Sequence, residues 1–397
     1  MKAGALKETW PGETRVAVVP AVVPALVKAG LEVVLESGAG AAAGFPDPEY
    51  SGKGAALGGR DQILAEATLL LGVRSFSGAQ DADAIARLQP RHVVVGFLDP
   101  LQRPEGAQAL AARGVTSFAL ELLPRISRAQ GMDALSSTAT MVGYKAVLLA
   151  ADTLPRMMPM MMTAAGTVAP ARVLVIGAGV AGLQAIATAR RLGAVVQAYD
   201  VRPAVKEQIL SLGAKFVELP LETAGAEDRG GYAKAQDEAF LRRQRELLAT
   251  VVAESDVVIS AAAVPGRKAP VLVTTEMLAG MRPGSVIVDL AAEQGGNCEA
   301  SEPGRDVDRY GVKVLAPLGL ATTIPHHASQ LFARNVANFV VNMTRKGELQ
   351  LDADDEIVRE SMLTRGGDVV HPRVREALGL APLAAPQPAR SGAPQPA

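Results

Sequence analysis

The sequence predicts an α/β protein in which two Rossmann-like parallel-sheet domains flank a nucleotide-binding cleft. Short apolar runs alternate with helix-compatible segments along most of the chain. These runs are apolar on both faces, as in a parallel sheet that is covered on both sides. A glycine-rich turn typical of dinucleotide binding begins at Gly177. The length of 397 residues is also more than one hydrophobic core usually fills, which favours two domains.

The composition limits the class of protein and excludes several kinds of site. The chain is 49% hydrophobic and 20% charged, with 40 Lys and Arg against 41 Asp and Glu. We therefore expect a globular protein that does not bind nucleic acid, since it lacks a basic excess. One cysteine, Cys298, leaves no disulfide framework, and the four histidines include no i, i+4 pair, so we expect no metal site.

A first series of elements fills the N-terminal third of the chain. Its apolar runs predict strands at residues 2–7, 32–36, 69–73, 92–98 and 115–120. The segments between them predict helices at residues 22–29, 61–67, 82–88 and 104–113. Gly30, Gly72 and Gly114 interrupt these patterns where loops are expected. We assign residues 1–135 to a first α/β domain.

A second series begins after residue 170 and predicts a NAD-binding Rossmann domain over residues 136–320. Its strands are expected at residues 172–176, 195–200, 216–218, 257–260, 286–290 and 312–315. Residues 133–154 are compatible with one long helix that ends at Pro155 and connects the domains. A last helix, at residues 329–344, is expected to return to the first domain, to which we also assign residues 321–380.

Three segments have unusual compositions. Residues 220–234 hold several glycines and charges and exceed an ordinary connection in length, so we expect a mobile loop there. Five methionines between Met157 and Met162 are expected to form a flexible apolar packing surface or to fill gaps, and they could line an interface. Residues 381–397 are rich in Pro and Ala and are expected to form a flexible tail.

The glycine-rich turn is the strongest functional signal in the sequence. It follows the expected strand 172–176 and opens a helix at Val180. In that context Gly177 makes a tight turn, Gly179 lets the backbone approach a pyrophosphate, and Gly182 lets the helix pack closely on the sheet. The helix N-terminus would supply N–H groups to the phosphates. The alternative is a close-packed turn without a ligand.

An acidic residue at the end of the next strand indicates which dinucleotide binds. Asp200 would accept hydrogen bonds from the adenosine ribose and repel a 2′-phosphate, so NAD(H) is favoured over NADP(H). Arg202 lies two residues further on and could soften that preference. We also expect Val201, and Ala262 after the strand 257–260, to contact the cofactor.

The loop before the connecting helix combines several orienting groups but no strong base. It contains Arg125, Gln130, Asp133 and Ser136, and it should face the cleft where NAD(H) would lie. These groups can hold a substrate, whereas a dehydrogenase that acts on an alcohol or amine also needs a general base. From the residues by themselves, Asp133 or a serine could equally be the N-cap of the connecting helix.

Several motifs resemble domain I, the NAD(H)-binding part, of proton-translocating nicotinamide nucleotide transhydrogenase, in the form with a split alpha subunit. They are KETWPGETRV, RISRAQGMDALSS, GAGVAGLQAIATARRLGA, YDVR, GGYAK, VPGRKAPVLV and VDLAAEQGGNC, and they cover nearly the whole chain except its tail. By this resemblance, Arg125, Asp133 and Ser136 would hold the carboxamide side of the NAD(H) nicotinamide. Gln130 would reach the ribose of NADP(H) on a partner subunit, and Tyr232 would lie in a mobile lid.

The resemblance also implies an activity and partners. Hydride would pass directly between the C4 atoms of two nicotinamides, so positioning suffices and no proton acceptor is required. The partners would be an NADP(H)-binding beta subunit and a membrane-spanning subunit that supports proton translocation, and the chain would be a homodimer. The N-terminal residues lack the apolar core of a signal peptide. We therefore expect a cytoplasmic protein that associates peripherally with the inner membrane through these subunits.

The related alanine dehydrogenases supply the main alternative. They carry a substrate-binding Lys near the third strand, a catalytic His after the fourth and an Asp before a Gln-Gly-Gly run. This chain has Arg74, no histidine between His92 and His326, and Glu293 at these places. An alanine-dehydrogenase-like amino-acid oxidoreductase is therefore disfavoured, and Glu293 is expected to lie against the cofactor. A non-catalytic NAD-binding module is the other alternative.

Overall fold

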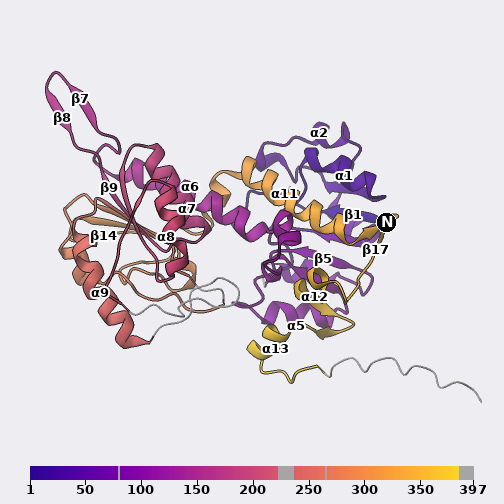
Figure 1. The fold of residues 1–397 in the computed structure, drawn as a ribbon. Helices are drawn as coiled ribbons and strands as arrows, with labels where there is room; N and C mark the ends of the chain where they lie inside the picture. The colour runs from indigo at the N-terminus through magenta and orange to yellow at the C-terminus, as the bar shows by residue number, and fades with distance from the viewer. Residues whose placement is uncertain (79–80, 222–236, 264–265, 384–397) are drawn as a thin grey trace, which may run out of the picture.

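The structure is a computed structural model that describes residues 1–78, 81–221, 237–263 and 266–383. Two α/β domains stand side by side, joined by helices α6 (Ala134–Thr153) and α11 (Pro325–Asn342), as Figure 1 shows. Each domain is built on one large sheet whose central strands run parallel. The predicted fold class is therefore confirmed.

The first domain contains an eight-stranded sheet with the order β19-β18-β6-β5-β4-β1-β2-β3. In chain order its strands are β1 (Lys2–Ala5), β2 (Glu32–Glu36), β3 (Ala56–Gly58), β4 (Leu69–Leu71), β5 (Val93–Gly96), β6 (Thr116–Ala119), β18 (Met362–Arg365) and β19 (Asp368–Val369). Leu69 and Leu71 join one buried cluster and Leu70 joins another, so each face of the sheet carries its own core. The C-terminal part of the chain completes this sheet, because β18 pairs with β6 in the antiparallel direction.

Helices of the first domain cover its sheet and match most of the predicted segments. They are α1 (Val23–Lys28), α2 (Asp47–Ser51), α3 (Arg60–Glu66), α4 (Ala82–Ala86), α5 (Glu105–Ala112), α12 (Glu356–Ser361) and α13 (Pro372–Ala377). The short strand β3 was not predicted, because its three residues are at most half-buried and carry no apolar run. A small hairpin, β16 (Thr344–Arg345) and β17 (Glu348–Leu349), follows α11.

The second domain contains a seven-stranded sheet with the order β11-β10-β9-β12-β13-β15-β14. Its strands are β9 (Arg172–Ile176), β10 (Val195–Tyr199), β11 (Lys215–Phe216), β12 (Val257–Ser260), β13 (Val286–Asp289), β14 (Asp306–Arg309) and β15 (Val312–Leu315), and its helices are α7 (Val180–Arg191), α8 (Lys206–Ser211), α9 (Glu238–Ala253) and α10 (Thr275–Ala279). The sheet pairs are parallel except that of the edge strand β14 with β15. The sequence did not predict β14, since it is polar and largely exposed, as an edge strand can be.

Helix α11 starts beside the second domain and packs into the first. Phe332 and Phe339 are buried in the core of the first domain, where they contact Phe97 and Phe118 with ring centroids 5.0 and 5.5 Å apart. The side chain of Ser329 also accepts a 3.1 Å hydrogen bond from the backbone N–H of Val16. The helix is therefore held firmly against the first sheet.

Helix α6 forms the other connection between the domains. Among the described residues, it has the length and the mean hydropathy, 1.2, that a membrane-crossing helix needs. It packs against α7 in the second domain and against α11. These contacts are those of a connector inside a two-domain protein, as residues 133–154 predicted.

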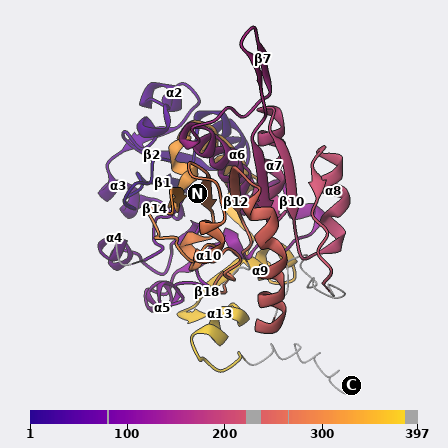
Figure 2. The same ribbon diagram turned by 90° about the vertical axis from the view of Figure 1, so that its left-hand side faces the viewer.

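The methionine-rich segment forms a hairpin that projects away from the second domain. Its strands are β7 (Met161–Thr163) and β8 (Gly166–Val168), and all of their residues are exposed. Figures 1 and 2 show this hairpin standing clear of both sheets in two perpendicular views. Met160 and Met162 are 59% and 75% exposed, so these two form an exposed apolar surface, one of the two predicted alternatives, and do not fill gaps in their own domain. The reason is that the hairpin carries them beyond the domain, whereas Met158, at its base, is buried.

Candidate functional site

A cavity of about 900 Å³ lies between the two domains. Residues that follow strands of both sheets line it, including Gly177 after β9, Asp200 after β10, Asp99 after β5 and Glu121 after β6. In open parallel sheets, ligands bind at the carboxyl ends of the strands, and here two such edges face one cavity.

The three glycines of the predicted dinucleotide turn have the geometry that their assigned roles require. Gly177 has a φ of +93°, and a Cβ there would lie 2.8 Å from the backbone of Ala261 and Ala262. A Cβ at Gly182 would lie 1.8 Å from the carbonyl oxygen of Gly177, so the helix can approach the turn only with glycine. A Cβ at Gly179 would meet nothing within 4 Å, which leaves room above the turn for a ligand.

The N-terminus of α7 opens onto the same cavity. Gly179 is its N-cap, and no side chain among the described residues caps the helix. Val180, the first helical residue, is 38% exposed and lines the cavity. The first N–H groups of the helix are therefore available to an anionic ligand such as a phosphate.

The Asp200 carboxylate is buried and accepts four hydrogen bonds from the chain itself. Its Oδ1 accepts from the backbone N–H of Arg202 at 2.8 Å and from Nε of Arg202 at 2.9 Å. Its Oδ2 accepts from Nη2 of Arg202 at 2.8 Å and from the backbone N–H of Ala178 at 2.7 Å. Asp200 thus ties the end of β10 to the glycine-rich turn and holds the Arg202 guanidinium against the cavity.

The other residues predicted to contact the cofactor also line this cavity. Val201 and Ala262 lie in its wall, and Asn297 fixes Ala262 by accepting from its N–H at 3.0 Å and donating to its carbonyl oxygen at 2.8 Å. Glu293 lines the cavity as well, and its Oε1 accepts from the N–H of Gly319 at 3.1 Å. Tyr232 lies outside the described residues.

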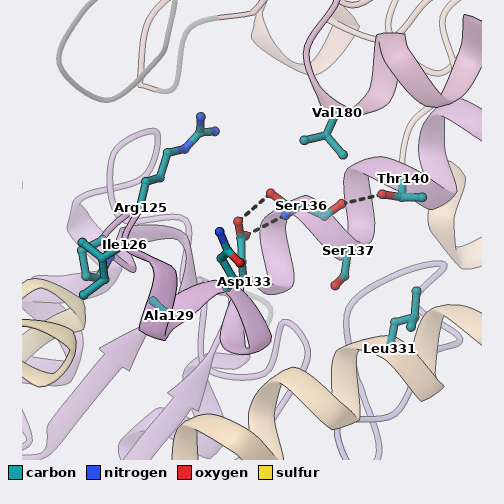
Figure 3. A pocket seen from close by; sticks show the side chains of 11 residues that line it. Arg125, Ile126, Ala129, Asp133, Ser136, Ser137, Thr140, Val180 and Leu331 are labelled. Atoms are coloured by element: carbon teal, nitrogen blue, oxygen red, sulfur yellow. Dashed lines mark hydrogen bonds between the residues drawn. The ribbon is translucent and has the colours of Figure 1, made fainter. Parts of the chain in front are cut away.

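A second, smaller cavity of about 480 Å³ is lined by the loop before α6. Arg125, Gln130, Asp133 and Ser136, the four residues predicted from this loop, all line it. Figure 3 shows Arg125 extending away from the loop, with Val180 across the cavity from it. Arg125, Ser136 and Val180 also line the larger cavity, so the two cavities meet at these side chains.

Asp133 is the N-cap of α6, which was one of the two alternatives that the sequence left open. Its Oδ1 accepts from the backbone N–H of Ser136 at 2.8 Å, and its Oδ2 accepts from the hydroxyl of Ser136 at 2.6 Å (Figure 3). Such a cap contributes about 1 kcal/mol to helix stability. Because the hydroxyl donates to Asp133, the Ser136 oxygen can still accept a hydrogen bond from a ligand.

The first domain adds acidic and basic side chains that the sequence analysis did not select. Asp99 and Glu121 line the larger cavity, and Oε1 of Glu121 accepts from the N–H of Asp99 at 2.7 Å. Burial raises the pKa of Glu121 to about 7, and burial also raises the pKa of Asp99 against the opposing effect of Arg103. Arg15 and Arg74 line the cavity too. Asp99 and Glu121 follow the ends of β5 and β6, and this position was the signal that could have identified them.

No group of three or more His, Cys, Asp or Glu side chains suited to a metal ion occurs among the described residues. His92 has no exposed surface, and its Nδ1 accepts a 3.0 Å hydrogen bond from the N–H of Gln89. It precedes β5, at the opposite end of the strand from the cavity. His92 is therefore a structural residue that does not line either cavity.

Two family models match the chain. "Alanine dehydrogenase/PNT, N-terminal domain" matches residues 4–142, and "Alanine dehydrogenase/PNT, C-terminal domain" matches residues 146–372. These matches cover both sheets and both cavities.

Curated relatives and solved structures agree with these matches. The first portion of the divided NAD(P) transhydrogenase subunit alpha of Rhodospirillum rubrum is 46% identical over 377 residues, which is 94% of this chain and 98% of that protein. A crystal structure of transhydrogenase from Sinorhizobium meliloti is similar with a TM-score of 0.84 at 45% identity, and the match covers 93% of this chain and 100% of that chain. An alanine dehydrogenase of Halomonas elongata is more distant, at 30% identity over 96% of this chain and 97% of that protein. The resemblance seen in the sequence motifs is thereby confirmed, and the chain belongs to the alanine dehydrogenase/PNT family, with transhydrogenase alpha subunits among its relatives.

Proposed function

We propose that this chain is the NAD(H)-binding subunit of a proton-translocating NAD(P)⁺ transhydrogenase, which exchanges hydride with NADP(H) on a partner subunit. The observation that carries this proposal is the meeting of two cavities at Arg125, Ser136 and Val180. The larger cavity has the glycine-rich turn of a dinucleotide site. The smaller one is lined by the loop whose sequence resembles the Arg-Gln-Asp loop of transhydrogenases.

The larger cavity would hold NAD(H) along the second domain. The pyrophosphate would lie over Gly179 at the N-terminus of α7, and the adenosine ribose would lie at Asp200. Val201, Arg202, Ala262 and Glu293 would line the rest of the path. The nicotinamide would then reach the end of the cavity where Arg125 and Ser136 lie.

The smaller cavity would admit the nicotinamide end of NADP(H) from the partner. Arg125, Asp133 and Ser136 would hold the carboxamide side of the NAD(H) ring, with Ser136 accepting from the amide while its own proton is held by Asp133. Gln130 would reach the ribose of NADP(H). Because hydride passes from carbon to carbon, no residue has to move a proton, and the loop contributes orientation.

The names of the relatives support a partnership with other chains. Several are called alpha subunits, and two of these names denote only the first portion of a divided alpha subunit. We propose an NADP(H)-binding beta subunit and a membrane-spanning subunit as partners, with this chain on the cytoplasmic side of the inner membrane.

We also propose that the chain is a homodimer. The exposed methionines of the β7–β8 hairpin are apolar side chains carried away from their own domain, where they cannot contribute to its core. Methionine adapts to irregular apolar surfaces, so a second copy is a suitable partner for them.

The decisive experiment measures hydride transfer between NADH and an NADP⁺ analogue in the presence of the purified NADP(H)-binding partner. Gln130→Asn shortens the side chain by one methylene and should reduce the single-turnover rate by about tenfold or more, since misplacement of reacting groups is costly. The affinity for NADH, measured by fluorescence titration, should be nearly unchanged. Normal turnover of this variant would contradict the role of Gln130.

The same titration tests the alternatives. Among the described residues that line the two cavities there is no histidine, the residue type expected as the catalytic group of an alanine dehydrogenase, and this disfavours that activity. NADH fluorescence should therefore stay constant after pyruvate and ammonium are added. A decaying signal would indicate alanine-dehydrogenase-like chemistry, and stable binding without transfer to any partner would indicate a non-catalytic NAD-binding module.

A further inference from the structure

The loop that carries Gln130 and Asp133 is held by two amide side chains of a distant helix. Its central part is a short 3₁₀ helix, Ser127–Met132. The carbonyl oxygen of Gly131 accepts a hydrogen bond from Nδ2 of Asn335 at 3.0 Å and another from Nδ2 of Asn338 at 2.8 Å. Both asparagines belong to α11, about 200 positions later in the sequence. A carbonyl oxygen has two lone pairs, and these two donors use both.

Asn335 occupies a position where an apolar residue would be expected. It is 6% exposed on a helix whose neighbouring buried residues are apolar, and its Oδ1 has no hydrogen-bond partner among the described residues. Burying an amide without full hydrogen bonding lowers stability. The compensating contact in the described structure is the hydrogen bond to Gly131, which points to a role in holding the loop.

Gly131 allows the close approach that this clamp requires. A Cβ at this position would lie 3.2 Å from Nδ2 of Asn338, which is tighter than an ordinary contact. The helix behind the clamp cannot easily give way, since Phe332 and Phe339 are fixed in the core of the first domain. The carbonyl of Gly131 is thus fixed relative to that core.

A second contact supports the outer side of the loop. The Arg128 guanidinium donates two hydrogen bonds to the Asp355 carboxylate, one of them 2.9 Å from Nη1 to Oδ2. Asp355 also caps α12 by accepting from the N–H of Ile357 at 2.9 Å. Asn335 is the buried member of the clamp, whereas the contact of Asn338 and the Arg128–Asp355 pair are exposed to solvent, so each of these two contacts is weaker than that of Asn335.

We propose that Asn335 and Asn338 are positioning residues for hydride transfer. They fix Gly131, which lies between Gln130 on one side and Asp133 on the other, and so set the distance between these groups and Val180 across the smaller cavity. This inference rests on the proposed function. It adds that the position of Gln130 and Asp133 is fixed by hydrogen bonds from α11, and not by contacts within the loop.

The test compares Asn338→Ala with the matched control Arg334→Ala, an exposed residue one turn earlier on the same helix. Asn338→Asp is a second variant, because it keeps the shape of the side chain and removes the donor. Both Asn338 variants should slow single-turnover hydride transfer with the NADP(H)-binding partner by about tenfold, since small displacements of reacting groups are costly. The affinity for NADH should change by less than about twofold, because the dinucleotide turn is untouched.

A readout independent of activity measures the loop itself. Amide hydrogen exchange in residues 127–133 should be faster in Asn338→Ala than in the unmodified chain and in Arg334→Ala. Unchanged exchange together with unchanged transfer would overturn the proposal, and so would a loss of NADH affinity in proportion to the loss of transfer. An unmodified protein that binds NADH but transfers no hydride would instead overturn the proposed function, and this role with it.

Discussion

The Asp200 carboxylate shows how the chemistry of one residue can be changed by its neighbour. All four of its lone-pair positions accept hydrogen bonds from the chain, and two of these donors belong to the Arg202 guanidinium. The two backbone donors are fixed by the turn, whereas the guanidinium is at the end of a flexible side chain. A ribose hydroxyl can therefore bond to Asp200 only after the Arg202 side chain withdraws.

This competition predicts that Arg202→Ala strengthens NADH binding. Without the guanidinium, ribose hydroxyls meet an unoccupied acceptor, and the dissociation constant should fall by about threefold to tenfold, the value of one or two hydrogen bonds. NADPH should bind more weakly, because the carboxylate is left without its cation and repels a 2′-phosphate. Fluorescence titration with both nucleotides measures the two effects.

Lys206→Ala is the control for this substitution. Lys206 is a nearby cation that pairs with Glu218 at the surface, so its loss changes the net charge equally and leaves Asp200 untouched. The control should leave both affinities nearly unchanged. Weaker NADH binding by Arg202→Ala would mean that the guanidinium assists the cofactor more than it competes.

At the scale of elements, predictions from the sequence were accurate for buried strands and poor for exposed ones. Strands β9, β12 and β15 have the predicted bounds, since each is an apolar run buried in a parallel sheet. The exposed strands β7 and β8 were not predicted, because nothing in their own domain selects a buried face. Contacts outside the chain would be needed to bury such a hairpin, and a single sequence does not reveal them.

The exposed methionines of the hairpin lead to a prediction about the oligomeric state. Met160→Lys combined with Met162→Lys places two charges on its apolar surface, so it should convert a dimer into a monomer by sedimentation velocity. Leu210→Lys, at an exposed leucine of α8, is the control and should leave the dimer intact. NADH binding should persist in both variants. A double variant that remains dimeric would contradict an interface at the hairpin.

At the scale of the whole molecule, buried acids make the stability depend on pH. Desolvation raises the pKa of Glu121 from 4.5 to about 7, and Oε2 of this residue has no partner among the described residues. Burial likewise raises the pKa of Glu8 to about 7, although the N–H groups of Val73 and Arg74 donate to it. Between the ordinary pKa of 4.5 and the raised pKa of about 7, the carboxyl groups of Glu121 and Glu8 keep their protons in the folded protein, whereas the unfolded chain has released them. The free energy of unfolding should therefore fall as the pH rises through this range.

Glu121→Gln should reduce this dependence, because glutamine does not titrate. Its melting temperature should fall less than that of the unmodified protein between about pH 5 and about pH 8. Glu348→Gln, at an exposed glutamate, should keep the original pH dependence. Scanning calorimetry across the range measures all three proteins. Equal slopes for Glu121→Gln and the unmodified chain would show that this carboxyl does not carry the effect.

The site was predictable where it depends on neighbours in sequence and was not where it depends on long-range contacts. The glycine-rich turn and Asp200 follow from local patterns, and the structure brings them to one cavity. The cover of Asp200 by Arg202 and the hold of Asn338 on Gly131 depend on side-chain conformation and on tertiary packing. No periodicity in the sequence encodes such contacts.

The double connection through α6 and α11 has a mechanical consequence. A single connector would leave the domains free to move in several directions, whereas we expect the two helices that cross between them to restrict relative motion mainly to rotation about one axis. Both cavities lie beside these helices, lined by Ser136 of α6 and, in the smaller cavity, by Leu331 of α11. In the proposed function, opening of the molecule would then widen the passage for a departing dinucleotide without displacing the two nicotinamide positions relative to each other. In the proposed function, the side chains that orient the two nicotinamides would thus lie beside the axis about which the domains rotate.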